Sequence, residues 1–221
     1  MMDSRFWTPI FVSLQVVGIA SVLAFILALL ASWLLKKRAF KGKIMLETAL
    51  MLPLVLPPTV IGFGLLVLFG RRSLIGQWYE QLFNQPIVFT LVAAVIAATV
   101  VAFPLIYQVL MNGFESVDDE LEDAARQMGA SEWAVFRYVS LPLAWRSLVS
   151  GFTLGFARAL GEFGATLMFA GSIVGVTQTI PISIYLAVET GNTLMALYWV
   201  ASIVLFSFLL LATVQRLKQS N

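Results

Sequence analysis

The sequence Leu121-Glu122-Asp123-Ala124-Ala125-Arg126-Gln127-Met128-Gly129-Ala130 is a polar segment in an otherwise apolar chain. Of the 221 residues, 60% are hydrophobic and 12% are charged, whereas a soluble domain carries about 25% charged residues. Such a chain has too little polar surface to cover a soluble globule. We therefore expect the lipid bilayer to surround most of the chain and the polar segment to lie outside it.

Long apolar runs flank the polar segment on both sides. They have the length, roughly 20 residues, that a helix needs to cross the hydrocarbon. Lipid cannot satisfy open backbone groups, and the alternating pattern of a barrel strand is absent, so the spans are expected to be helices. The sequence predicts an all-α polytopic membrane protein with one transmembrane domain over residues 1–221. Its five long spans are predicted at about 9–35, 44–69, 87–111, 145–170 and 193–214.

Prolines and glycines subdivide this pattern. Three prolines predict a kink or break near residues 52–59 of the second span, either as an ordinary proline kink or as a bend that lines a pathway. Two outer segments, 70–86 and 171–192, are each predicted to hold a helix too short to span. The first has aromatic residues suited to the membrane interface, and the second is framed by Pro181 in a first turn and Gly191 as a stop.

Lysine and arginine residues are distributed unevenly between the two sides of the predicted spans. One side receives Lys36, Lys37, Arg38, Lys41, Lys43, Arg126, Arg137, Arg146, Arg216 and Lys218, and the other receives Arg5, Arg71 and Arg72. Positive residues near span ends remain in the cytoplasm. We therefore expect a multi-pass protein of the cytoplasmic (inner) membrane, with its N-terminus outside and its polar segment and C-terminus in the cytoplasm.

Two residue types that carry much of enzyme chemistry are missing. The chain has no cysteine and no histidine, so it has neither a thiolate site nor the commonest metal ligand and general base. It also lacks the Gly-x-x-x-x-Gly-Lys-Ser/Thr loop that cradles nucleotide phosphates. We expect no catalytic residue, no metal site, no cofactor in this chain and no ATPase site of its own.

Helix signals divide residues 115–142 into a hairpin. Ser116, three residues before Asp119, predicts a helix start, and acidic residues there favour the positive end of the helix dipole. Gly129 predicts a left-handed helix end, and Ser131 predicts the start of a second helix that ends before a proline. This cytoplasmic hairpin either docks in a groove of another protein or folds back on its own bundle.

The order of residues in the hairpin resembles the cytoplasmic signature of the permease subunits of binding-protein-dependent ABC importers. That signature is an acidic residue, two alanines, three variable residues, glycine, nine residues, an aliphatic residue, one residue and Leu-Pro. This chain has Asp123-Ala124-Ala125, Gly129, Val139 and Leu141-Pro142 at that spacing. Aspartate stands where glutamate is commonest, directly after Glu122, and valine replaces the usual isoleucine.

The resemblance implies the type I permease fold of ABC importers, in which the hairpin is a coupling helix seated in an ATPase subunit. It assigns this ATPase-coupling role to Glu122, Asp123, Ala124, Ala125, Gly129, Ala130, Trp133 and Phe136. It also implies a set of partners. These are a second copy of the chain in a homodimer, two cytoplasmic ABC ATPase subunits that bind ATP and Mg, an extracytoplasmic oxyanion-binding protein and membrane lipid, but no nucleic acid.

Two further stretches, residues 52–62 and 156–166, look like the molybdate branch of this family. The resemblance implies ATP-driven import of molybdate, or of the similar tungstate, by alternating access. Sulfate permeases share much of the second stretch, so a sulfate-type oxyanion permease is one alternative, and a passive anion channel is an alternative of another class. The candidates for the pathway or for packing are Pro57, Pro58, Thr59, Arg158, Glu162, Phe163 and Thr166.

Arg158 and Glu162 lie four residues apart and therefore on one helix face. Two ionisable groups within a span are expensive unless they are paired or wet. Either Arg158 offers its charge to a passing oxyanion, or Glu162 neutralises it and the pair fixes helix packing. The glycines between residues 151 and 164 likewise predict close helix approach or a hinge near Gly161 and Gly164.

Overall fold

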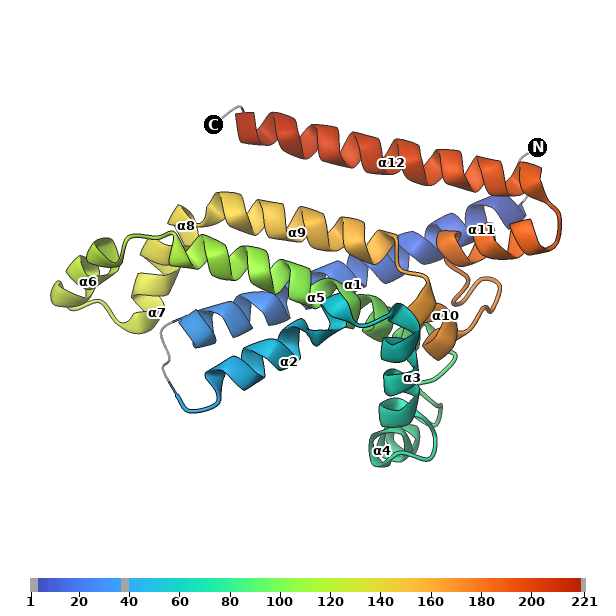
Figure 1. The fold of residues 1–221 in the computed structure, drawn as a ribbon, viewed down its shortest axis with the longest axis horizontal. Coiled ribbons are helices and arrows are strands. Elements are labelled where there is room, and N and C mark those ends of the chain that lie inside the picture. The colour runs from blue at the N-terminus through green and yellow to red at the C-terminus, as the bar shows by residue number, and fades with distance from the viewer. Residues whose placement is uncertain (1–3, 37–39, 220–221) are drawn as a thin grey trace.

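The computed structural model describes residues 4–36 and 40–219 of the chain. The described residues are mostly helical, and none of them forms a strand. Among them, three helices are long and apolar enough to cross a membrane: α1 (Ser4–Lys36), α5 (Leu91–Glu115) and α12 (Thr193–Gln219). Together with α9 (Trp145–Leu160), they run along the long axis of the molecule (Figure 1).

Shorter elements join these four helices. They are α2 (Lys43–Val55), α3 (Pro58–Phe69), α4 (Leu74–Phe83), α6 (Asp119–Gln127), α7 (Glu132–Val135), α8 (Leu141–Leu143), α10 (Gly164–Ala170) and α11 (Ile180–Glu189), with a π-helical turn at Phe136–Ser140.

The second predicted span is two helices rather than one. α2 and α3 are separated by Leu56 and Pro57, whose ψ angles of 143° and 138° are not helical, and the two helices are bent by 118°. Pro57 and Pro58 have no N–H to donate, so one helix cannot run through them. The break that the prolines predict near residues 52–59 is therefore confirmed.

The fourth predicted span, 145–170, is interrupted as well. α9 ends at Leu160 and α10 begins at Gly164, and between them Phe163 has φ −131° and ψ −58°, outside helical geometry. The unbroken helix expected over 145–170 was wrong. The break lies near Gly161 and Gly164, where a hinge was one of the two interpretations of the glycines. Within the described ranges, α2 and α3 count as a fourth crossing only if the bent pair is one span. The structure therefore does not confirm five unbroken spans.

The remaining predicted boundaries move by a few residues. α5 begins at Leu91 rather than at residue 87, because Thr90 caps the helix and its hydroxyl accepts the Ala93 N–H at 3.4 Å. The two predicted short helices are confirmed as α4 and α11, and their placement on the outer side stays a prediction. Pro181 lies in the first turn of α11, and Gly191 follows it with φ +76°.

The centre of the bundle is α5, which packs against α1, α9, α2 and α10. α1 carries a stripe of alanines at every fourth position, Ala20, Ala24 and Ala28, none of which is exposed. Small residues let helix backbones approach closely in lipid. At this contact the Thr99 hydroxyl of α5 lies 3.5 Å from the Ala20 carbonyl of α1, while it donates to the Val95 carbonyl of its own helix at 2.7 Å.

α9 approaches α5 through glycines. A Cβ atom at Gly155 would lie 2.3 Å from Ile106 Cδ1, and one at Gly151 would lie 2.4 Å from Leu110 Cδ1. Ile106 and Leu110 are fully buried, so their side chains have little room to move. These two glycines therefore serve close packing.

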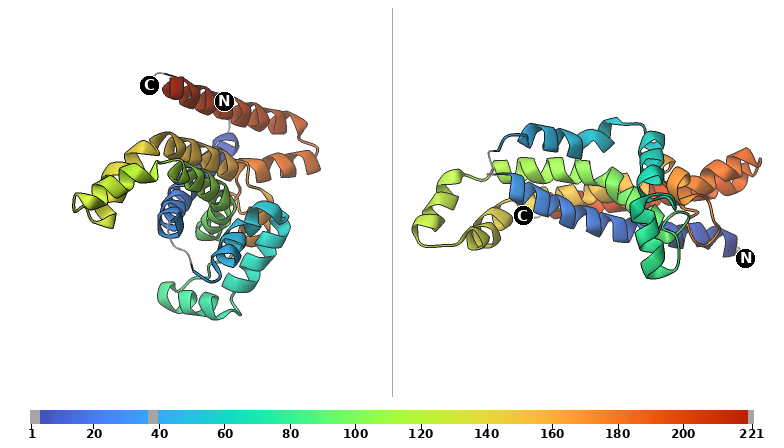
Figure 2. Two further views of the ribbon diagram at one scale, coloured as in Figure 1. Left: turned by 60° about the vertical axis from the view of Figure 1, so that its left-hand side comes forward. Right: turned by 90° about the horizontal axis from the view of Figure 1, so that it is seen from below.

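The two ends of the bundle differ in the helices and basic residues that lie there. The N-terminus lies at one end, and the C-terminus lies toward the other, where α6 and α7 project (Figures 1 and 2). α1 ends at Lys36 and α2 begins at Lys43 on the side of α6 and α7, whereas Arg5 lies near the N-terminus. Lys37 and Arg38 are outside the described residues. The hairpin and several of the basic residues predicted to lie in the cytoplasm are therefore at the same end of the bundle.

Substitution of Gly155 tests the close contact between α9 and α5. We expect Gly155→Ala to destabilise the purified chain by about 1–3 kcal/mol, as overpacking does in cores, and to lower its melting temperature in detergent. Gly64→Ala is the matched control, because a Cβ atom there meets nothing within 4 Å. Since alanine is the better helix former, the control should be neutral or slightly stabilising. Equal melting temperatures for the two variants would contradict the packing role.

Candidate functional site

The predicted hairpin exists and projects from one end of the bundle (Figure 1). Its first helix, α6, is capped by Asp118, whose carboxylate accepts the Glu120 N–H at 2.9 Å. The prediction that Ser116 starts this helix was wrong. Ser116 ends α5 instead, and its hydroxyl donates to the Gly113 carbonyl at 2.7 Å.

The turn between the two hairpin helices follows the predicted signals. Gly129 has φ +88°, and its N–H donates to the Arg126 carbonyl at 2.9 Å. Ser131 then caps α7 by accepting the Ala134 N–H at 3.3 Å. Residues other than glycine rarely adopt a φ this positive, so this turn depends on Gly129.

The outer face of the hairpin is open to solvent and partly apolar. Asp123, Ala124 and Gly129 are exposed, and Ala125 and Ala130 are half-buried. Met128 is 89% exposed and Trp133 is 58% exposed, with Leu121 and Tyr138 exposed near them in the sequence. Exposed apolar side chains grouped on one element mark interaction surfaces. Met128 was not among the predicted coupling residues, although its helical spacing from Leu121 and Ala125 was a signal for it.

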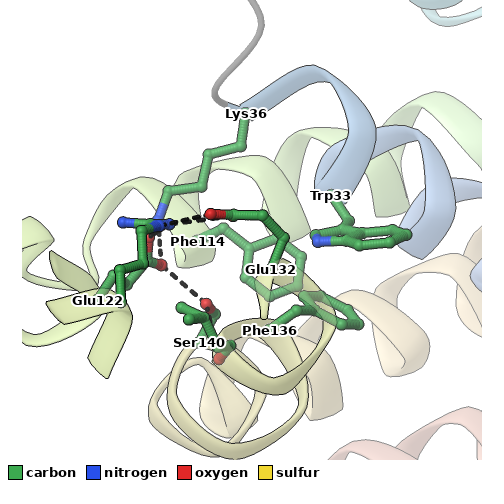
Figure 3. Close-up of a pocket in the computed structure, with 9 residues that line it drawn as sticks. Trp33, Lys36, Phe114, Glu122, Glu132, Phe136 and Ser140 are labelled. Carbon is green, nitrogen blue, oxygen red and sulfur yellow. Dashed lines mark hydrogen bonds and ion pairs between the residues drawn. The ribbon is translucent and has the colours of Figure 1, made fainter. Parts of the chain in front are cut away.

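Two of the predicted coupling residues face inward instead. Glu122 is 1% exposed and Phe136 is 6% exposed. The Glu122 Oε1 atom accepts hydrogen bonds from Lys36 Nζ and from the Ser140 hydroxyl, both at 2.8 Å (Figure 3). Glu122 and Phe136 therefore hold the hairpin in place from within, and the expectation that they form part of the docking surface is corrected to a supporting position.

Arg126 joins the two helices of the hairpin across the Gly129 turn. Its guanidinium donates to Glu132 Oε1 and to Asp123 Oδ1, both at 2.6 Å, and more weakly to Glu122 Oε2 at 3.4 Å. The hydrogen bond to Glu132 is the main cause that raises the pKa of Arg126 above its ordinary value. Arg126 therefore stays charged at any physiological pH.

An aromatic cluster ties the hairpin to the bundle. Measured between ring centres, the Phe136 ring lies 4.9 Å from Trp33 of α1 and 5.7 Å from Phe114 of α5 (Figure 3). It also lies 5.7 Å from the Trp133 ring. Trp33 and Trp133 meet edge to face at 5.6 Å. Such aromatic pairs add about 0.5–1.5 kcal/mol each to the area they bury. The inner side of the hairpin therefore folds back on the bundle while its outer side stays free.

A π-helical turn places Ser140 beside Glu122. The Leu141 N–H donates to the Phe136 carbonyl, five residues back, and Pro142 follows without an N–H. Insertion of one extra residue into a helix re-aims the side chains beyond it. Lys36 and Ser140 were both missed as site residues. No local pattern identifies them, because Lys36 is 86 residues and Ser140 is 18 residues away from Glu122.

The two groups of predicted pathway residues lie together at the breaks in their helices. Pro57, Pro58 and Thr59 are exposed at the start of α3. A Cβ atom at Gly164, in the first turn of α10, would lie 2.9 Å from Pro58 Cβ and 3.7 Å from the Thr59 nitrogen. Discontinuous helices that meet inside a membrane are a common setting for transport sites.

Arg158 and Glu162 form the predicted ion pair. Arg158 NH1 lies 3.0 Å from Glu162 Oε2, and Glu162 Oε1 accepts the Ala165 N–H at 2.8 Å, which caps α10. Glu162 is buried and Arg158 is partly exposed. The contacts favour the packing interpretation for Glu162, because both of its oxygens serve the chain itself.

The last two pathway candidates also make contacts within the chain. Thr166 is fully buried in α10, and the Phe163 ring centre lies 5.3 Å from that of Tyr185 in α11. Among the described residues, no group of three or more carboxylates could hold a metal ion.

A bundle whose long helices are apolar enough to cross a membrane is typical of the integral membrane proteins. More particularly, the chain belongs to the family of binding-protein-dependent transport system inner membrane components, whose family model matches residues 20–219.

Named relatives agree with this family. The chain is 53% identical over 215 residues to YvgM of Bacillus subtilis (strain 168), a protein named for a molybdenum transport system, covering 97% of this chain and 95% of that protein. It is 42% identical to the molybdenum transport system permease protein ModB of Escherichia coli (strain K12), covering 83% and 80% of the two chains.

Similar folds occur in solved ABC transporters. A chain of the inward-facing MetNI methionine ABC transporter superposes with a TM-score of 0.77 at 17% identity, over 100% of this chain and 99% of that chain. A chain of a bacterial alginate ABC transporter in complex with its periplasmic protein superposes with a TM-score of 0.79 at 12% identity, over 99% and 80%. At these identities the likeness concerns the fold alone.

Two adjacent acidic residues of α6 test the inward and outward faces of the hairpin. We expect Glu122→Gln to destabilise the hairpin by roughly 3–5 kcal/mol, because it removes the buried carboxylate that pairs with the largely covered Lys36 charge. Asp123→Asn is the control and should cost at most about 1 kcal/mol, since its ion pair is exposed. Amide hydrogen exchange of residues 119–140 in detergent measures both effects. Equal protection in the two variants would contradict a supporting role for Glu122.

Proposed function

We propose that this chain is the membrane-spanning permease subunit of an ATP-driven importer that moves molybdate across the cytoplasmic membrane. The single observation that carries the proposal is the hairpin, in which the signature residues Asp123, Ala124 and Gly129 lie exposed around a left-handed glycine. The 53% identity to YvgM over nearly the whole chain supports molybdate as the substrate. Tungstate, with nearly the same size and charge, is a further substrate of the same pathway.

The proposal includes partners that supply energy and substrate. Import of a dianion into a cell that is negative inside costs about 4.6 kcal/mol per 100 mV, twice the figure for one charge. The chain has no phosphate-binding loop of its own, so two cytoplasmic ABC ATPase subunits bind ATP and Mg in its place. A second copy of the chain completes the pathway, and an extracytoplasmic oxyanion-binding protein delivers the anion.

The proposed topology has five crossings, with the N-terminus outside and the hairpin and C-terminus in the cytoplasm. α1, α5 and α12 cross as single helices, and α2 with α3 and α9 with α10 cross as broken ones. The position of Lys36, Lys43 and Arg126 on the side of the hairpin supports this orientation, since positive residues stay inside. α4 and α11 then lie at the outer mouth.

The proposed mechanism is alternating access. The binding protein delivers the anion to the outer mouth, ATP binding closes the two ATPase subunits, and the hairpins seated in them move together. The helices then reorient so that the anion leaves on the cytoplasmic side. The paired state of Arg158 leaves the pathway with little free positive charge, so selectivity resides mainly in the binding protein.

Substitution of Gly129 tests the docking of the hairpin. We expect Gly129→Pro to abolish co-purification with the ATPase, because proline requires a negative φ and removes the N–H that donates to Arg126. Gly191→Pro is the matched control. It creates the same conflict at a left-handed glycine after α11, and it should leave ATPase binding intact. Normal co-purification of Gly129→Pro would contradict docking through the hairpin.

Transport itself tests the proposed substrate. Proteoliposomes that contain this chain, the candidate ATPase and the binding protein are expected to take up molybdate only when ATP is supplied. Tungstate should compete at similar concentrations and sulfate only at much higher ones. Uptake down a gradient without ATP would indicate a passive channel. Equal competition by sulfate would favour a sulfate-type permease, a candidate supported by 34% identity to a probable sulfate permease of Chlorella vulgaris over 93% of this chain.

A further inference from the structure

α1 makes polar side-chain contacts with other elements near both of its ends. At the end beside the hairpin, Lys36 donates to Glu122 at 2.8 Å. At the opposite end, the Ser13 hydroxyl accepts the Ile180 N–H at 2.7 Å, in the first turn of α11. Both contacts are largely removed from solvent, since Glu122 and Ser13 are buried. One helix thus connects the hairpin with the outer helix α11.

The cytoplasmic contact is reinforced on the same face of α1. Trp33 precedes Lys36 by three residues, a spacing that puts two side chains on one helix face. Trp33 packs on Phe136 while Lys36 binds Glu122, so α1 touches both arms of the hairpin. The outer contact is reinforced as well, because the Trp199 indole N–H of α12 donates to the Phe6 carbonyl of α1 at 3.1 Å.

The part of α1 between these two contacts has the features of a stiff helix. Residues 13–36 form an uninterrupted helix that contains no proline, and Gly18 is its single glycine. At 1.5 Å per residue, Ser13 and Lys36 are about 35 Å apart. Its alanine stripe packs on α5, the most buried of the long helices. A displacement at one end of such a helix reaches the other end without being absorbed by a hinge.

We propose that residues 13–36 of α1 act as a strut that transmits the movement of the hairpin to α11, with Lys36–Glu122 as its inner joint and Ser13–Ile180 as its outer joint. The inference rests on the proposed function, in which ATP moves the hairpin. It assigns Lys36 and Ser13 as positioning residues, which touch neither ATP nor the transported anion. The broken helices α2–α3 and α9–α10 bend at the pathway, whereas α1 carries the motion past it.

The absence of cysteine from the chain makes a direct test possible. A Val188→Cys reporter near the end of α11, where Val188 is 60% exposed, is labelled with a maleimide. The complete complex with ATPase and binding protein is placed in lipid nanodiscs, with and without ATP. We expect ATP to change the labelling rate of the reporter, and Lys36→Met to reduce that change about fivefold or more, the lower range of typical allosteric coupling.

Two lysine controls accompany this experiment. Lys36→Arg keeps the charge and should restore the response to ATP. Lys41→Met removes an exposed lysine on the same side of the bundle and should leave the response unchanged. If Lys36→Met responds to ATP as strongly as the reporter chain alone, the strut is wrong while the proposed function stands. If the Val188→Cys chain with Lys36 unchanged neither responds to ATP nor binds the ATPase, the proposed function is wrong.

The outer joint provides a second measurement, which does not depend on the folding of the hairpin. We expect Ser13→Ala to lower the number of anions transported per ATP hydrolysed by about fivefold or more. Ser21→Ala is the matched control, since Ser21 is equally buried in α1 but its hydroxyl donates to its own helix, at Val17. It should stay within about twofold of the unchanged chain.

The double variant Lys36→Met with Ser13→Ala separates one strut from two unrelated defects. Substitutions this far apart normally combine as the product of their separate effects. Two joints of one strut should instead give a double variant no worse than the more severe single one. A product of the two effects, or an unchanged ratio of transport to hydrolysis in Ser13→Ala, would overturn the proposal.

Discussion

The structure depends on the close packing of apolar helices that gain little from the hydrophobic effect in lipid. Lipid tails are as apolar as leucine side chains, so helices associate where small residues let their backbones approach. α5 is the helix on which this packing converges. The alanine stripe of α1 and Gly151 and Gly155 of α9 bring the two neighbours against it. The hairpin and the two helix breaks are positioned by this three-helix core.

The hairpin has a buried inner surface and an exposed outer surface, and the two differ in chemistry. Its inner surface is a buried carboxylate with three donors from three elements, beside a cluster of four aromatic rings. A buried charge is tolerated when it is paired and hydrogen-bonded, and here the partners fix the hairpin to α1. Its outer surface exposes small and apolar residues around Gly129. Because the inner face is fixed to α1, a displacement of the outer face is transmitted to the bundle.

The breaks at 56–57 and 161–163 have different local causes but meet in space. Two prolines stop α2, whereas Glu162 turns back to cap α10. The contact of Gly164 with Pro58 brings the breaks together. The same Glu162 carboxylate forms an ion pair with Arg158.

The sequence by itself determined the helical class, the two short helices, the proline break and the turn of the hairpin, because each depends on nearby residues or on composition. The coupling signature and Gly129 could likewise be recognised from spacing alone. Tertiary structure decided the burial of Glu122 and Phe136 and the roles of Lys36 and Ser140. These depend on contacts between distant parts of the chain. A carboxylate in an acidic helix start has the same local pattern whether it faces water or a lysine 86 residues away.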